Sequence, residues 1–323
     1  MSNSAFVLGG SAGVGRAVVG ALRARGFEVA VIARGAERLA EMEAADGGIQ
    51  TAQADVGDAA ALEAAVSDLL GRVGAPRIWV NCAMATSFST FDQMEIDEFD
   101  KIVRTTFLGQ VNGVRLALRH MKKGNIVNIG SGLAYRPVPG QSAYCAAKHA
   151  INGFTGAIRS ELLRDGRPIS LSLVQLPAIN TPQFDWARNR LPMKPQPAPP
   201  IFAPEVAARA VMQAIDTDAR EILVGGSVLE LVFGDMVLPN MIDHRLADSG
   251  IEMQKSDRPE EGSRADNLFS PVSYPARAEG SFSDRARDRA AIVDGDLMRK
   301  AVVFGGLGVA AGLAFLLGRA SRL

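Results

Sequence analysis

Tyr144 and Lys148 stand four residues apart, and Ser131 lies a short distance upstream. On a helix, residues four apart lie on the same face, which would place the Lys148 ammonium beside the Tyr144 phenol. A free tyrosine has a pKa of about 10, and a nearby positive charge lowers that value. The pair could therefore pass a proton to or from a substrate oxygen. An ordinary exposed helix pair has the same spacing, so the motif needs support from other segments.

Ser131 follows the apolar run 125–130, which is typical of a buried strand. In open α/β sheets, ligands bind at the carboxyl ends of the strands, where this hydroxyl would stand. We therefore take Ser131, Tyr144 and Lys148 as candidate catalytic residues.

The amino-terminal segment has the pattern of a phosphate-binding turn. The short apolar run 5–8 leads into Gly9, Gly13 and Gly15, and apolar residues at 18, 19 and 22 then show helical spacing. Glycines allow close backbone approach, and a helix start offers free N–H groups to a pyrophosphate. A purely structural tight turn is the alternative interpretation.

The second predicted strand, residues 28–33, is followed directly by Arg34, and Arg38 lies four residues further on. An acid at this point binds the ribose 2′-hydroxyl of NAD, whereas an arginine accommodates the 2′-phosphate of NADP. Because no acid stands at the strand end, we predict NADP(H) in preference to NAD(H). The alternative is that both arginines are solvated surface charges.

These segments together resemble the short-chain dehydrogenase/reductase family over about residues 5–235. The resemblance implies that the glycines hold the cofactor and that the catalytic trio is Ser131, Tyr144 and Lys148, with Lys148 also binding the nicotinamide ribose. It further implies a set of cofactor contacts along the strand ends: Asp55 and Val56 at the adenine, Asn81 in the turn after the fourth strand, and the Ile179 backbone and Thr181 hydroxyl at the nicotinamide amide.

Two segments depart from the family pattern. The family's Asn-Asn-Ala-Gly turn reads Asn81-Cys82-Ala83-Met84 here, and Thr106 stands where the family has a catalytic asparagine. That asparagine helps to hold a water in a proton relay. A threonine hydroxyl can also bind water, but with one donor and a different reach. The relay is therefore in question, whereas the tyrosine chemistry is not.

Composition limits the function classes. The 323 residues include 47% hydrophobic types, enough for a large core, and 35 basic residues balance 35 acidic ones. Nothing in this balance indicates a nucleic-acid surface. The two cysteines fit a reducing compartment, and the three histidines lack ligand spacing, so we expect no metal.

Alternating strand and helix patterns predict one doubly wound, Rossmann-type parallel sheet with helices on both faces, spanning residues 1–250. Within it, the proline-rich segment 182–204 is expected to cover the substrate. Phe184, Trp186 and Phe202 would make that lid apolar and would suit an apolar substrate. A packed surface loop without substrate contact is the alternative.

The carboxyl-terminal residues change character. Residues 251–300 are rich in charge, proline, glycine and serine, and we expect a disordered polar linker. Residues 301–318 form an uncharged apolar stretch between basic flanks, which predicts a helix and a membrane anchor for an otherwise cytoplasmic domain. The alternative is a helix that packs on the enzyme or in an oligomer interface. The first strand begins so early that no room is left for a signal peptide.

The sequence therefore predicts an NADP(H)-dependent oxidoreductase that interconverts a small apolar carbonyl compound and its alcohol. By resemblance, the chain would form a homodimer or homotetramer through the helices around 109–121 and 142–164. The rival hypothesis is a membrane-tethered dinucleotide-binding scaffold or redox sensor with little turnover. Epimerisation or dehydration on the same fold is a third hypothesis.

Overall fold

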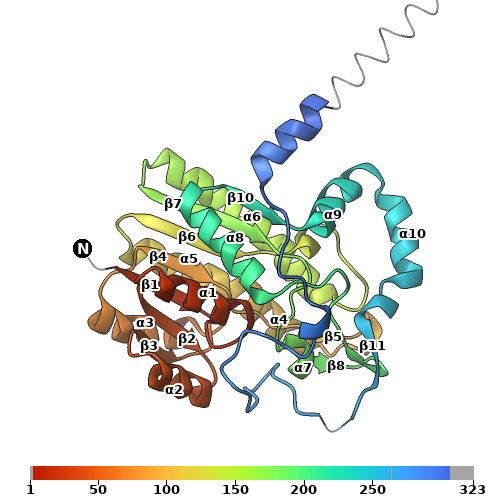
Figure 1. The fold of residues 1–323 in the computed structure, drawn as a ribbon, viewed down its shortest axis with the longest axis horizontal. Coiled ribbons are helices and arrows are strands. Elements are labelled where there is room, and N and C mark those ends of the chain that lie inside the picture. Colours follow the sequence, from red (N-terminus) through yellow and green to blue (C-terminus); the bar gives the residue numbers. More distant parts are fainter. Residues whose placement is uncertain (1–2, 263, 306–323) are drawn as a thin grey trace, which may run out of the picture.

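The computed structural model describes residues 3–262 and 264–305, and one parallel sheet dominates it (Figure 1). Seven strands lie parallel in the order β10-β7-β6-β4-β1-β2-β3. Their bounds are β1 Ser4–Leu8, β2 Glu28–Ala33, β3 Ile49–Gln53, β4 Ile78–Asn81, β6 Gly124–Ile129, β7 Ile169–Gln175 and β10 Glu221–Val224. The predicted α/β class and Rossmann-type sheet are confirmed.

Helices cover both faces of the sheet. Alternate side chains of β1 enter different cores, because successive residues of a strand point to opposite faces. Ala5 and Val7 pack with α1 and α8, whereas Phe6 and Leu8 pack with α3, α5 and α6. The helices are α1 Gly13–Ala24, α2 Ala36–Ala45, α3 Ala59–Val73, α4 Ile96–Val103, α5 Gly109–His120, α6 Ser142–Arg164, α8 Pro204–Thr217, α9 Gly226–Val237 and α10 Pro239–Ser249.

The strand register brings the chemistry to one edge. Leu8 of β1 pairs with Ile32 of β2 and with Asn81 of β4, so these strands end together. The chain runs from β1 to β2 on one side, whereas β4 lies on the other side of β1, which makes this a switch point where such sheets bind ligands.

Helices α4 and α5 form a nearly continuous helical region. A π-helical turn, Arg104–Leu108, joins α4 to α5. Such turns widen the helix locally and are frequent at functional sites. Here the turn carries Thr105 and Thr106.

The predicted lid is a folded segment. It contains the short helix α7 Gln183–Trp186 and the strands β8 Arg188–Asn189 and β9 Met193–Pro195. Strand β8 pairs with β5 Ser87–Phe88, and β9 pairs with β11 Lys255–Pro259 from the carboxyl-terminal segment.

The carboxyl-terminal segment differs from the disordered linker that composition predicted. Strand β12 Ile292–Asp294 pairs antiparallel with β10 and adds an eighth strand to the sheet. Leu268 is fully buried. Few apolar residues suffice here because the segment packs on an existing domain and takes its hydrogen bonds from it; the composition rule concerns chains that must fold alone.

Only the first residues of the predicted membrane anchor, 301–305, belong to the part of the chain that the structure describes. Residues 295–305 are helical, and Val303 and Phe304 are exposed. Residues 306–318 lie outside the described residues. Among the residues that are described, no helix combines the length and apolar character needed to cross a bilayer.

Candidate active site

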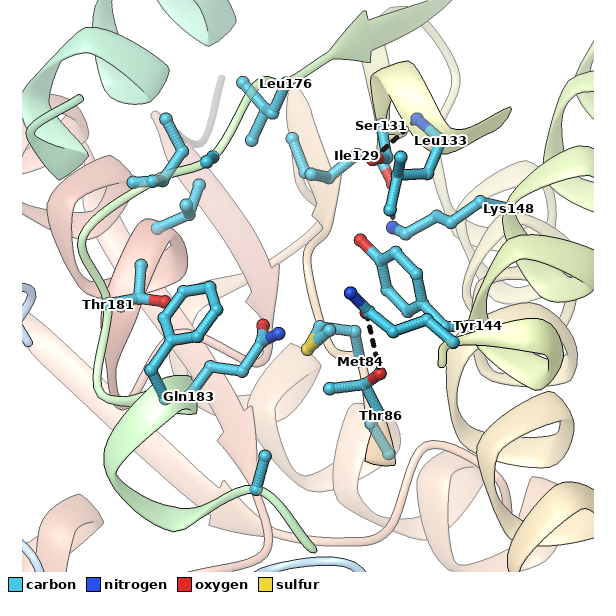
Figure 2. A pocket seen from close by; sticks show the side chains of 18 of the residues that line it. Met84, Thr86, Ile129, Ser131, Leu133, Tyr144, Lys148, Leu176, Thr181 and Gln183 are labelled. Atoms are coloured by element: carbon cyan, nitrogen blue, oxygen red, sulfur yellow. Dashed lines mark hydrogen bonds between the residues drawn. The ribbon is translucent and has the colours of Figure 1, made fainter. Parts of the chain in front are cut away.

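Ser131, Tyr144 and Lys148 line one cavity of about 510 Å³ at the carboxyl edge of the sheet (Figure 2). Ser131 lies two residues after the end of β6, and Tyr144 and Lys148 lie one turn apart near the start of α6. The Lys148 Nζ is 5.5 Å from the centroid of the Tyr144 ring. The spacing argument thus correctly placed all three side chains together.

Burial sets the protonation of this pair. Desolvation lowers the pKa of Lys148 to about 8, and its Nζ donates a hydrogen bond to the Ile129 carbonyl at 2.6 Å. Desolvation also raises the pKa of Tyr144, although a hydrogen bond with Ser131 opposes it. The sequence argument expected the ammonium to lower the pKa of Tyr144, whereas burial raises it. The tyrosine is therefore a protonated phenol, suited to donate a proton.

Hydrogen bonds with Leu133 and Gln175 fix the position of Ser131. Its Oγ accepts a hydrogen bond from the Leu133 N–H at 3.1 Å, and its own N–H donates to Gln175 Oε1 at 2.8 Å. Gln175 Nε2 donates in turn to Glu221 Oε1 at 2.9 Å. Glu221 is 1% exposed and pairs with Arg299 of the carboxyl-terminal segment. Sequence reasoning missed this network because its members are far apart in the chain.

The glycine-rich turn has the shape of a backbone cradle. Gly9 has a φ of +84°, and a Cβ there would stand 2.5 Å from the Ala83 nitrogen. A Cβ at Gly15 would stand 2.1 Å from the Gly9 carbonyl oxygen. Gly9 and Gly13 line the cavity, whereas Gly15 lets helix α1 pack closely behind them. The glycines therefore bring backbone without side chains to the floor of the cavity, as close approach of a pyrophosphate requires, although the Gly13 N–H already donates to the Arg277 carbonyl at 3.1 Å.

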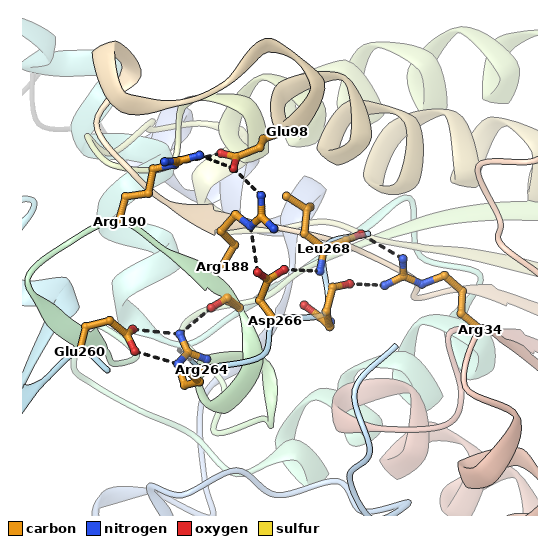
Figure 3. Close-up of polar contacts among 10 residues, drawn as sticks. Arg34, Glu98, Arg188, Arg190, Glu260, Arg264, Asp266 and Leu268 are labelled. Atoms are coloured by element: carbon orange, nitrogen blue, oxygen red, sulfur yellow. Dashed lines mark hydrogen bonds and ion pairs between the residues drawn. The ribbon is translucent and has the colours of Figure 1, made fainter. Parts of the chain in front are cut away.

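The end expected to hold the adenosine contains Arg34, Asp55 and Val56, all of which line the cavity. The Asp55 carboxylate accepts hydrogen bonds from the Gly57 N–H and from Lys101. The Arg34 guanidinium donates to the carbonyls of residues 267, 268 and 269 in the carboxyl-terminal segment (Figure 3). Arg34 is therefore placed as predicted, with partners that the sequence did not indicate.

At the other end, Ile179 and Thr181 line the cavity beside α7 (Figure 2). Asn81 is not brought to the cavity. It is 1% exposed, its Oδ1 accepts from Trp79 Nε1 at 2.9 Å, and its Nδ2 donates to Asn128 at 2.8 Å. The Asn81 side chain therefore links β4 to β6 through its hydrogen bond with Asn128.

Thr106 does not take the asparagine's expected place in the relay. Its hydroxyl both accepts from the Ala85 N–H and donates to the Ala85 carbonyl, each at 2.9 Å. The neighbouring Thr105 lines the cavity, and no described residue hydrogen-bonds its buried hydroxyl. Thr105 is thus the hydroxyl that could hold a water here, which residue-by-residue comparison with the family did not indicate.

The expected lid aromatics divide into two groups. Phe184 and Trp186 line the cavity, whereas Phe202 is buried against Gly225 and does not. The substrate end is largely apolar, and sequence reasoning missed most of it: Leu133, Val138, Ala187, Pro199, Leu231, Ile242, Leu246 and Met253. Polar groups there include Gln141, Gln183, Gln196, Gln254, Glu230 and Arg245.

The fold and this site define a dinucleotide-binding α/β enzyme class with a Ser-Tyr-Lys centre. Residues 3–190 match the sequence profile of the family described as short chain dehydrogenase. The chain therefore belongs to the short-chain dehydrogenase family and is an oxidoreductase of that family.

Relatives share the family at modest identity. The chain is 27% identical to the uncharacterized oxidoreductase YxnA of Bacillus subtilis over 262 residues, which covers 78% of this chain and 74% of YxnA. It is 30% identical to the uncharacterized oxidoreductase YohF of Escherichia coli, covering 62% of this chain and 82% of YohF.

Solved structures agree on the fold. A short-chain dehydrogenase of Streptomyces avermitilis matches with a TM-score of 0.65 and 24% identity, over 77% of this chain and 96% of its own. A variant of actinorhodin polyketide ketoreductase, solved with NADPH, matches with a TM-score of 0.58 and 23% identity, over 66% of this chain and 90% of its own.

Proposed function

We propose that this protein is an NADP(H)-dependent oxidoreductase that interconverts an apolar carbonyl compound and its alcohol, with Tyr144 as the general acid and base. The observation that carries the proposal is the meeting of Ser131, Tyr144 and Lys148 in the cavity that the glycine turn also lines. The NADPH in the structural relative supports the cofactor choice only as an analogy of fold.

In the reduction direction, the protonated Tyr144 hydroxyl donates its proton to the carbonyl oxygen of the substrate. Ser131 Oγ hydrogen-bonds the same oxygen and stabilises the charge that develops on it. Lys148, charged below a pKa of about 8, favours the phenolate that remains on Tyr144. When bound, the nicotinamide cofactor supplies or accepts the hydride. Oxidation uses the same groups in reverse.

The cofactor preference rests on Arg34 and Arg38. Both guanidiniums line the cavity, and desolvation lowers the pKa of each. The half-buried Arg34 directly after β2 and the buried Arg38 of α2 are two cations that suit a 2′-phosphate better than a 2′-hydroxyl. Equal affinity for NADPH and NADH in a fluorescence titration would refute this part.

The rival hypothesis of a redox sensor is less well supported. Sensor cysteines need an accessible thiolate. Burial raises the pKa of Cys82 to about 12 and that of Cys145 to about 11, so both thiols stay protonated. A binding scaffold would also have no need of the catalytic trio.

The test is NADPH consumption by the full chain with medium-chain aliphatic ketones and aldehydes, and NADPH formation from NADP⁺ with the corresponding alcohols. Tyr144→Phe removes only the hydroxyl and should lower turnover by roughly 10²–10⁴-fold, with NADPH binding kept. Turnover that survives this substitution contradicts the assignment.

Two further proposals concern assembly. We propose that residues 301–318 anchor the protein to a membrane, which ultracentrifugation of a lysate tests. We also propose a dimer or tetramer formed through α5 and α6, which light scattering tests.

A further inference from the structure

Residues 264–282 run along the mouth of the cavity from the lid to the glycine turn. Their hydrogen-bond partners come from three parts of the expected cofactor groove: β2 with α2, the lid, and the glycine turn with residues 180–181. We call this segment the strap. Asn267 of the strap lines the cavity itself.

We propose that the strap is a wall of the cofactor-binding site, so that a dinucleotide enters and leaves only when the strap detaches. The inference rests on the proposed use of a dinucleotide cofactor, but not on which nicotinamide cofactor is preferred or on the substrate.

The strap holds the two arginines expected at the adenosine end. Arg34 donates to the carbonyls of Asn267, Leu268 and Phe269, and Arg38 donates to the Val272 carbonyl at 2.7 Å. Arg38 is 8% exposed, and its Nε has no hydrogen-bond partner among the described residues. Carbonyl oxygens satisfy these donors without cancelling their charge. An anion on the cofactor would therefore meet two cations already positioned by the strap.

An ion-pair cluster around the buried Glu98 fastens the strap to the lid (Figure 3). Asp266 pairs with Arg188 Nε at 2.9 Å, and Arg188 pairs with Glu98 at 2.6 Å. Glu98 is fully buried on α4 and also binds Arg190 at 2.6 Å. Strap, lid and α4 are thus joined through the Arg188 guanidinium, which pairs with both Asp266 and Glu98, and this makes the strap a defined structural element and not a loose tail.

Leu268 inserts the strap into the domain. Its side chain is 0% exposed in a small apolar cluster with Ala85, Ile102 and Ala143, and Tyr144 packs against the same cluster. The two neighbouring residues are less buried than Leu268: Asn267 is half-buried and Phe269 is 43% exposed. Leu268 is therefore the apolar contact through which the strap can be detached by substitution.

The strap also closes the opposite end. The Gly13 N–H donates to the Arg277 carbonyl at 3.1 Å, and the Phe282 N–H donates to Asn180 Oδ1 at 3.0 Å. At Gly280 a Cβ would stand 2.4 Å from the Thr181 carbonyl oxygen, so the two backbones are in direct contact. Because the strap contacts both ends of the groove, a dinucleotide cannot pass it from the side while these contacts hold.

The test compares Leu268→Asp with Ser270→Asp in the full chain. Both add one carboxylate to the strap, but position 268 is buried and position 270 is exposed. A charge at 268 must stay in water and will hold the strap off the domain. Stopped-flow fluorescence with NADPH, and separately with NADH, gives the association and dissociation rates. We expect Leu268→Asp to raise both rates at least tenfold, with Ser270→Asp like the wild type.

A second pair covers the case in which Leu268→Asp does not fold. Asp266→Asn weakens the link to Arg188, and Asp257→Asn removes the same charge from an exposed position of β11. We expect faster cofactor exchange only in Asp266→Asn, with faster amide hydrogen exchange confined to the strap. If the cofactor bound only to the variants in which the strap is detached, the result would support still more strongly the proposal that the strap is a wall of the binding site.

Unchanged rates in the folded strap variants overturn the inference, and so does the absence of binding to any variant. NADH binding tighter than NADPH refutes the proposed cofactor preference, yet leaves the strap test intact. Loss of turnover on every ketone tried likewise has no bearing on the exchange rates.

Discussion

The parallel sheet and the carboxyl-terminal segment 251–305 are held in place by different interactions. The central strands of the sheet are continuously buried: every residue of β1 and β4 is buried. The segment buries few large apolar side chains and depends on arginine–carbonyl bonds, ion pairs and short strand pairings. The sheet therefore owes its order to the hydrophobic effect, whereas the segment owes its order mainly to polar complementarity with a surface that already exists.

This difference has a consequence for function. Apolar packing is lost as a unit when the domain unfolds, whereas a segment held by exposed polar contacts can open locally at much lower cost. The residues that would carry out chemistry belong to the rigid part, and the strap that covers them belongs to the part that can open. Perturbing each part should therefore give different results, and the following predictions compare them.

The largest effect is expected in the rigid part, at Gly15. A Cβ there would stand 2.1 Å from the Gly9 carbonyl oxygen, and neither backbone can move without displacing the turn. We expect Gly15→Ala to cost about 3 kcal/mol or more of unfolding free energy and to abolish cofactor binding.

Gly20→Ala is the matched control in the same helix. Nothing lies within 4 Å of a Cβ at this position, so the substitution should be neutral or should stabilise by about 1 kcal/mol. Urea unfolding and NADPH titration measure both variants. A Gly15→Ala variant that binds cofactor normally would show that the backbone of the turn can shift to accommodate a Cβ despite its close packing.

The next effect concerns Lys148, the buried cation of the rigid part. Its pKa falls from 10.5 to about 8 because burial disfavours the charged form. Between these values the unfolded chain holds the proton and the folded chain has released it. The unfolded state then binds more protons, so this group makes the fold more stable as pH rises from about 8 to 10.5, by roughly 3 kcal/mol.

The measurement is the unfolding free energy of wild type and Lys148→Met across pH 7–10. Other groups titrate in both proteins, so the difference between the two curves isolates Lys148. Wild type should gain stability relative to the variant as pH rises through 8. Parallel curves would mean that Lys148 keeps its ordinary pKa in the fold.

The sequence predicted the rigid part well because local rules govern it. Glycine spacing, the alternation of strand and helix, and the four-residue step from Tyr144 to Lys148 are all properties of neighbouring residues. The catalytic trio and the glycine turn could therefore be placed from the sequence. Arg34 was also placed at the cavity, although its carbonyl partners lie in the carboxyl-terminal segment.

The remaining features depend on contacts between distant residues. Composition predicted disorder for 251–300, because a charged segment cannot build its own core; it could not indicate that Leu268 fits an existing apolar cluster. Asn81 has the residue type of a cofactor ligand, yet Trp79 and Asn128 take its amide. Thr106 has a hydroxyl in the right place, but both of its hydrogen bonds go to Ala85. In each case at least one partner that lies far away in the sequence, such as Asn128 for Asn81 and Ala85 for Thr106, helps to decide the role.

The smallest effect is expected where the two parts meet, at Arg299. This arginine pairs with Glu221, which is 1% exposed and reaches the Ser131 N–H through Gln175. Arg299→Ala leaves that carboxylate without its cation and should cost about 1–3 kcal/mol of unfolding free energy; the arginine side chain is 32% exposed, which keeps the loss below that of a fully buried pair.

Arg258→Ala is the control, since this exposed arginine of β11 has no ion pair among those the structure describes. The double variant Glu221→Gln/Arg299→Ala removes both charges and should recover part of the loss, because the stranded carboxylate is then gone. Additive losses would mean that Glu221 and Arg299 act independently. A recovered double variant would show that the carboxyl-terminal segment, although held by polar contacts, helps to support the sheet edge on which Ser131 stands.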